Sequence, residues 1–386
     1  MQDSTGPRIA HQFVQGLQVS DPRYDLWVYG AFLVEVPRRI GANAALDAAA
    51  ESFSTALPVL RTKVVCEDMR AKYIDALAAL RTTLNSPTLA SSSCTLCAIF
   101  LLVITQYYLG IRGTQTASHS NGILQVIRYA SMNEAKSEFD LGLLKAMCFD
   151  VIFDGLFNPA IEPDEHFYQL IESWEIRRLE VPVQQLSITQ HNKMSRPIDS
   201  LSLRNLARLL PSVHRPSLHN TELRSTYQMA LRDLATVRDR VKIAQRMLDR
   251  KRDTEASAEV KCLILHQTMH GLLLAVSLLV NGILRALGQS TSLLAAESTQ
   301  LTQEVLDLAT ACCRYRPLGA SYIPLCLLVA CAVSEAEDLR PRLAELLEDW
   351  QADFSAKGYL EGVGWLRTRL RDIRYGREDV LVEGYD

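Results

Sequence analysis

Two histidines four residues apart, His266 and His270 in the segment H-Q-T-M-H, have the spacing that places both rings on one face of a helix. Such a pair can hold a zinc ion, or exchange protons with a ligand in a polar cavity. Zinc proteases with this spacing need glutamate at the second position as general base, and Gln267 stands there instead. His266 and His270, with His119 as a third candidate, are therefore predicted either to act as acid-base groups or to contact a ligand. The alternative is that they are core histidines whose hydrogen bonds are satisfied within the protein.

Cys94 and Cys97 have the C-x-x-C spacing that often begins a zinc site. A structural zinc needs four ligands, and no second C-x-x-C pair follows. The remaining cysteines are at positions 66, 148, 262, 312, 313, 326 and 331. The pair also opens a strongly apolar segment, where free cysteine behaves as a small hydrophobic residue. We predict that it holds no metal.

Two charged patterns have both a functional and a purely structural interpretation. Asp150 and Asp154 share a helical face, and their spacing resembles that of the magnesium-binding carboxylates of terpene cyclases, but no second acidic motif accompanies them. Surface carboxylates near a helix end are the preferred interpretation. A basic stripe repeats every fourth residue in segment 238–253 and could bind phosphate or an acidic partner. Interleaved aspartates favour a solvated helix face instead.

Composition limits the class of protein. The chain has 386 residues, 48% hydrophobic residues, 22% charged residues and a net charge of -3, which is ordinary for a globular protein and gives no overall attraction for nucleic acid. Nine cysteines are too few for a disulfide scaffold, and no signal peptide is recognised. An intracellular location, nuclear or cytoplasmic, is expected. Segment 263–284 is long and apolar enough for a membrane span, but its histidines, Gln267 and Asn281 favour a buried core helix.

The elements that must position these residues are helices. Apolar residues recur at helical spacing almost throughout, and alternating strand patterns are lacking, so the fold is predicted to be all-α, a large bundle of stacked antiparallel helix pairs. The expected helices are 43–60, 63–84, 95–109, 119–129, 141–156, 222–251, 256–287, 293–315, 322–334, 339–357 and 363–374. The expected organisation is an N-terminal extension (1–41), an N-terminal helical half (42–181), a proline-rich linker (182–220), a C-terminal helical half packed on the first (221–375) and a tail (376–386).

Two longer motifs carry a resemblance. T-L-C-A-I-F-L-L-V-I-T-Q-Y-Y-L-G is followed by S-H-S-N-G-I-L-Q-V-I-R-Y-A-S, and the second half contains C-C-R-Y-R-P-L-G-A-S-Y-I-P-L-C-L-L-V-A-C-A and then R-P-R-L-A-E-L-L-E-D-W. From about residue 42 to 374 this order resembles the fungal-specific transcription factor domain, the helical regulatory domain of zinc-cluster factors. Members of that family normally begin with a six-cysteine zinc module, whereas the first cysteine here is Cys66. We therefore expect no direct sequence-specific DNA binding.

The resemblance implies a regulatory protein that serves a fungal secondary-metabolite pathway and needs no cofactor. The candidate partners are another protein, a small hydrophobic ligand and a second copy of the chain, and no membrane is expected. The alternative is a biosynthetic enzyme that uses an internal pocket of the same fold for a cyclisation or isomerisation. The candidate ligand-binding residues are Tyr107, Tyr108, Trp174, Arg316 and Tyr322. A closed apolar core would favour regulation, and a large pocket would favour catalysis.

Overall fold

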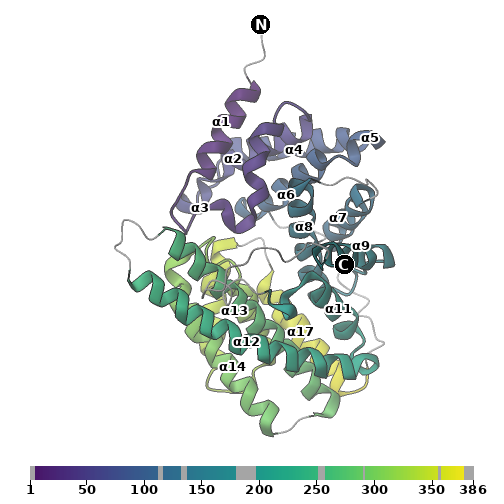
Figure 1. Cartoon of the computed structure of the whole chain (residues 1–386), viewed down its shortest axis with the longest axis vertical. Helices are drawn as coiled ribbons and strands as arrows, with labels where there is room; N and C mark the ends of the chain where they lie inside the picture. Colours follow the sequence, from purple (N-terminus) through teal and green to yellow (C-terminus); the bar gives the residue numbers. More distant parts are fainter. Residues whose placement is uncertain are drawn as a thin grey trace.

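The fold is all-α, as predicted (Figure 1). The computed structural model describes residues 5–111, 116–131, 137–179, 197–250, 257–289, 292–354 and 358–377, and no strand occurs in these ranges. The stacking of the helices as antiparallel pairs stays a prediction.

The first part of the chain contains α1 (Thr5–Leu17), η1 (Leu26–Tyr29), η2 (Ala31–Arg39), α2 (Ala44–Ala56), α3 (Val59–Thr62), α4 (Glu67–Leu84), α5 (Pro87–Ala90), α6 (Ser93–Tyr108), α7 (Thr116–Ser131), α8 (Glu138–Phe157) and α9 (Glu165–Leu179). The second part contains η3 (Asp199–Leu201), α11 (Leu203–His214), η4 (Pro216–His219), α12 (Asn220–Asp249), α13 (Ser257–Leu284), η6 (Arg285–Gln289), α14 (Ser292–Cys312), η7 (Cys313–Tyr315), α15 (Ile323–Val333), α16 (Arg340–Gln351), η8 (Ala352–Phe354) and α17 (Tyr359–Arg374).

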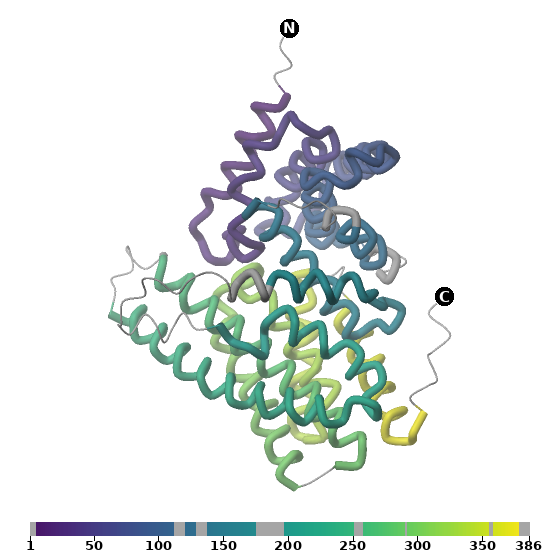
Figure 2. The backbone as a smooth tube through the Cα atoms, turned by 45° about the vertical axis from the view of Figure 1, so that its right-hand side comes forward, coloured from purple at the N-terminus to yellow at the C-terminus, as the bar shows by residue number. Residues whose placement is uncertain are grey.

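These helices form two groups joined by one continuous hydrophobic core (Figure 2). The purple and blue helices α1 to α6 lie at the N-terminal end, and the green and yellow helices α12 to α17 lie at the other end. Within the first group, Asn43 caps α2 by accepting hydrogen bonds from the Ala45 and Leu46 amides, which satisfies donors that every helix start leaves free. Its amide nitrogen also donates to Thr95 Oγ1 at 3.1 Å, which ties α2 to the start of α6.

Helix α13 is the central helix of the second group. It packs against α12, α14 and α15, and most of its side chains are buried. Among the described residues, Ala258–Gln289 is the helix long and apolar enough to cross a membrane, and 83% of its most apolar window is buried inside the protein. Packing of neighbouring helices therefore accounts for its apolar character.

One face of α13 nevertheless carries a polar stripe. His266, His270, Ser277, Asn281 and Arg285 recur at helical spacing, and each is at least nine-tenths buried. Buried polar groups are costly unless they form hydrogen bonds, so the neighbouring helices must supply partners. Helices α12 and α14 supply partners for His270, Asn281 and Arg285, whereas Nδ1 of His266 and Oγ of Ser277 have no hydrogen-bond partner among the described residues.

Regular structure also occurs where the sequence suggested an extension and a linker. Helix α1 lies within segment 1–41, and it buries Ile9 and Phe13 against the core. Helix α11 lies within segment 182–220 and buries Leu206 and Leu210, with Pro211 inside its last turn. An amphipathic pattern outweighs one proline there, because only the hydrogen bonds near the helix end are lost.

The contact between α13 and α15 generates a test. A methyl group added at Gly271 would lie 2.5 Å from the ring of Tyr322, which is buried against this helix. We expect Gly271→Ala to lower the free energy of unfolding by about 1–3 kcal/mol, because overpacking forces side chains to move. In the control Gly364→Ala, the added methyl group meets no described residue within 4 Å outside its own helical backbone and chain neighbours, and stability should rise by up to about 1 kcal/mol. Chemical denaturation measures both, and equal effects would contradict this packing.

Candidate functional site

His270 belongs to a cluster of charged residues between three helices. Its Nε2 lies 2.7 Å from Oε1 of Glu304 on α14. Arg238 on α12 donates two hydrogen bonds to the same carboxylate, from Nε to Oε1 at 2.8 Å and from Nη2 to Oε2 at 2.6 Å. This bidentate geometry is the strongest form of arginine–carboxylate contact. The cluster therefore joins α12, α13 and α14 around one carboxylate.

The electrostatics of Glu304 show how tightly it is held. Burial by itself raises the pKa of the carboxyl group, but hydrogen bonds from His270 and Arg238 outweigh burial and lower the pKa from 4.5 to about 2. The carboxylate is thus ionised at any physiological pH. It is engaged by groups of its own protein on both oxygens, which suits a structural crosslink better than a general acid or base.

His266 lies one turn earlier on α13 and is 3% exposed. Burial, and then the nearby charge of Arg240, lower its pKa, so the ring is neutral at pH 7. A neutral imidazole could accept a proton, but neither of the two pockets described below is lined by His266 or His270. The third candidate, His119, lies in α7, and its side chain is outside the described residues.

Two of the predicted ligand-binding tyrosines line a pocket of about 140 Å³ between α3, the end of α6 and η8. Tyr107 and Tyr108 form its wall together with Lys63 and Asp353. Lys63 Nζ lies 3.3 Å from Asp353 Oδ1, and Arg316 donates from Nε to Asp353 Oδ2 at 2.7 Å. The structure therefore places Tyr107, Tyr108 and Asp353 in one pocket, and Arg316 binds the Asp353 carboxylate without lining that pocket.

Polar side chains around this pocket already have partners within the protein. Arg316 also pairs with Asp349, and its guanidinium carbon lies 4.4 Å from the Trp350 ring centroid. The Tyr108 hydroxyl donates to the Tyr29 hydroxyl at 2.8 Å. Lys63 joins the N-terminal helices to η8 through Asp353, whereas the ion pairs of Arg316 lie within the second helix group.

Tyr322 and Trp174 lie apart from that pocket. The Tyr322 ring packs on α13, and its hydroxyl is 3.1 Å from Cys312 Sγ. Trp174 is a buried residue of α9. Neither residue lines either pocket.

The C-x-x-C pair lies at the start of α6, where Cys94 is half-buried and Cys97 is buried. Burial raises the pKa of both thiols, which disfavours the thiolate form that binds zinc. No group of three or more potential metal ligands occurs within the described ranges.

Asp150 and Asp154 are the two carboxylates that the sequence placed on one helical face. Asp154 accepts a hydrogen bond from Ser120 at 2.7 Å and links α8 to α7.

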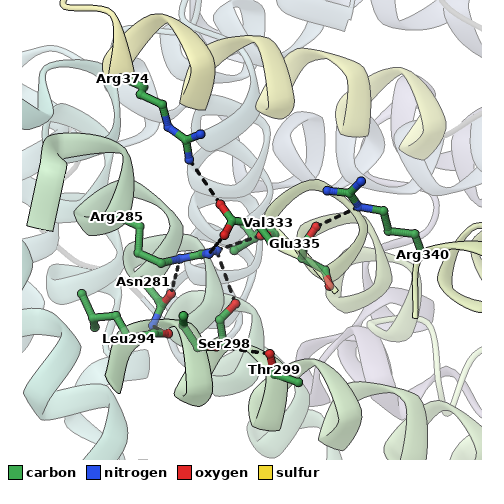
Figure 3. A network of polar contacts seen from close by, with 11 residues as sticks. Asn281, Arg285, Leu294, Ser298, Thr299, Val333, Glu335, Arg340 and Arg374 are labelled. Carbon is green, nitrogen blue, oxygen red and sulfur yellow. Dashed lines mark hydrogen bonds and ion pairs between the residues drawn. The ribbon is translucent and has the colours of Figure 1, made fainter. Parts of the chain in front are cut away.

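A second pocket, of about 210 Å³, is lined by several arginines and was missed by the sequence analysis. Figure 3 shows the polar contacts of three of them, Arg285, Arg340 and Arg374. It lies where η6, the end of α15 and α17 meet. Its lining residues are Gly282, Arg285, Ala332, Val333, Ser334, Glu335, Arg340, Arg367, Leu370, Arg371, Arg374 and Tyr375. We call it the arginine pocket. One signal for it was readable: arginines at positions 367, 371 and 374 have the spacing of a single helical face.

Comparison with known proteins finds no matching family model, no matching curated protein and no matching solved structure. The resemblance to the fungal transcription factor domain therefore rests on the sequence motifs and stays a prediction.

The charged cluster predicts a pH-dependent stability. The lowered pKa of Glu304 corresponds to about 3 kcal/mol of stabilisation. It is fully present above pH 4.5, the ordinary pKa, and is lost as the pH falls towards about 2. We expect Glu304→Gln to lower the free energy of unfolding by about this amount at neutral pH, and by much less near pH 3. The exposed Glu345→Gln on α16 is the control. A loss that stays constant down to about pH 3 would contradict the assignment.

The thiol burial predicts the metal content. Purified protein should contain far less than one zinc per chain by elemental analysis, and Cys97→Ala should not change that content. Stoichiometric zinc that disappears in this variant would overturn the interpretation of Cys94 and Cys97 as core residues.

Proposed function

We propose that the chain is a regulatory protein of the fungal transcription factor domain type, which acts through a protein partner or a small effector. The proposed setting is control of a secondary-metabolite pathway, in the nucleus or cytoplasm. The supporting sequence motifs are those at the start of α6 and around α15, and the all-α fold agrees with them.

The observation that carries the proposal is the continuous apolar core, together with the small size of the two pockets described above. One apolar cluster runs from Ile9 to Ile373 through both helix groups. The two pockets have volumes of about 140 and 210 Å³, below the roughly 300–1,000 Å³ typical of sites that enclose a drug-sized molecule. A cyclase or isomerase of a hydrophobic metabolite needs such an enclosure to exclude water from the reacting molecule. Regulation through the surface does not.

The contacts of His270, a catalytic candidate from the sequence, and of the basic stripe in segment 238–253 support the same proposal. His270 and Glu304 are engaged with each other, and Arg238 from the basic stripe is engaged with Glu304. The basic stripe of segment 238–253 therefore offers fewer free charges to nucleic acid than its sequence suggests. We propose that the protein affects transcription through a partner and does not bind DNA through a zinc cluster formed by its described residues.

Gene deletion tests the proposal. Loss of the protein should lower or raise the transcripts of genes near its own, as measured by RNA sequencing, while the purified protein shows no salt-sensitive binding to their promoter DNA. The double variant His266→Ala, His270→Ala should lower the melting temperature. Unchanged transcripts together with accumulation of one pathway intermediate would favour the enzyme instead.

A further inference from the structure

The arginine pocket has an unusual balance of charge. Five of its lining residues are arginines, and its single acidic residue is Glu335. Several like charges around one pocket destabilise the folded protein by mutual repulsion. Natural sequences keep such conflicts mainly where function requires them.

Arg285 forms the fixed wall of this pocket (Figure 3). Its side chain is 4% exposed, and it donates to Asn281 Oδ1 at 3.0 Å and to the Val333 carbonyl at 2.8 Å. Nη1 lies 2.9 Å from Oε2 of Glu335, whose Oε1 is 3.2 Å from Nη2 of Arg374. Arg285 begins η6, a π-helical turn, and such turns are frequent at functional sites. The guanidinium is thus held rigidly before any ligand arrives.

Three more arginines lack a carboxylate partner among the described residues. Arg340 donates to the backbone carbonyl of Ser334 at 3.3 Å, and Arg367 donates to that of Cys331 at 2.7 Å. Arg371 is exposed and forms no ion pair within the described ranges. A carbonyl satisfies an N–H group but carries no net charge, so no ion pair with a described carboxylate compensates the positive charge of this trio.

Ser334 supplies an independent indication. It is 5% exposed, it lines the arginine pocket, and its Oγ has no hydrogen-bond partner among the described residues. A buried hydroxyl without a partner costs free energy that a bound acceptor would recover. It lies between Val333 and Glu335, beside the fixed guanidinium of Arg285.

We infer that the arginine pocket binds the phosphate or diphosphate group of a small ligand. Planar guanidinium groups match phosphate oxygens in bidentate geometry. A single carboxylate is already accommodated here by two arginines, as Glu335 shows, so the remaining three suit a group with more charge and more oxygens. The volume of about 210 Å³ suits such a group and not a whole large metabolite.

This site goes beyond the proposed regulatory function, because ligand binding and transcript changes are measured separately. The phosphate group could belong to a soluble metabolite or to a lipid headgroup. Pyrophosphate in solution and vesicles that contain a phosphoinositide distinguish the two sources.

Isothermal titration with pyrophosphate at low ionic strength tests the inference. The intact protein should bind about one pyrophosphate per chain, and Arg371→Glu should weaken binding about tenfold or more, because a charge-assisted contact is replaced by repulsion. The matched control is Arg342→Glu, an exposed arginine on α16 that does not line the pocket, and its affinity should stay within about twofold of the original. Equal weakening by both variants would mean general electrostatics and would overturn the site.

Glu335→Gln provides a second measurement with the opposite sign. Removal of the built-in carboxylate frees Arg285 and Arg374, so pyrophosphate should bind more tightly. Without ligand the variant should melt at a lower temperature than the original protein, because buried Arg285 loses its counter-charge. Pyrophosphate should then raise its melting temperature by more than it raises that of the original protein.

Citrate at the same concentration should bind more weakly than pyrophosphate, and equal binding would overturn the choice of phosphate. Vesicle binding that requires Arg371, without pyrophosphate binding, would support the phosphate group and identify a lipid as its source. Absence of binding to both probes would overturn the inference while leaving the transcript test unaffected.

Discussion

Burial of α13 is the constraint on which the second half of the structure depends. This helix is apolar enough to be buried on nearly all sides, yet one face carries histidine, asparagine and arginine side chains. A polar group that leaves water is costly to bury without a partner, because an unpaired group costs more than a hydrogen bond gains. Glu304 meets this need for His270, while Tyr227 Oη accepts from Asn281 at 3.0 Å. The rotation of α13 between α12 and α14 is set by these contacts.

The polar stripe of α13 differs between the two ends of the helix in how its side chains are paired and exposed. Near its start the polar stripe is enclosed, and His270 pairs with Glu304 of α14, which Arg238 of α12 also binds. At its end the stripe reaches Arg285, which is buried but whose counter-charge, Glu335, is 56% exposed. There the polar stripe meets the arginines of α17. A ligand can therefore compete for charge at this end only.

The sequence predicts the local structure well, because helical periodicity is a property of neighbouring residues. The expected segments 95–109 and 256–287 correspond to Ser93–Tyr108 and Ser257–Leu284. The spacing of His266 and His270 likewise indicated one helical face. Their role could not be read, because Glu304 and Arg238 come from helices that only tertiary packing brings together, 66 residues apart in the chain. The arginine pocket was missed for the same reason, since its charges come from η6, α16 and α17.

Amide hydrogen exchange of the full chain, with and without pyrophosphate, tests most directly whether α13 is structural along its enclosed part and responsive at its end. Pyrophosphate should slow exchange in segments 281–289, 333–340 and 367–375, and should leave the amides of 263–274 unchanged. Slower exchange centred on His266 and His270, with none around Arg285, would contradict this prediction.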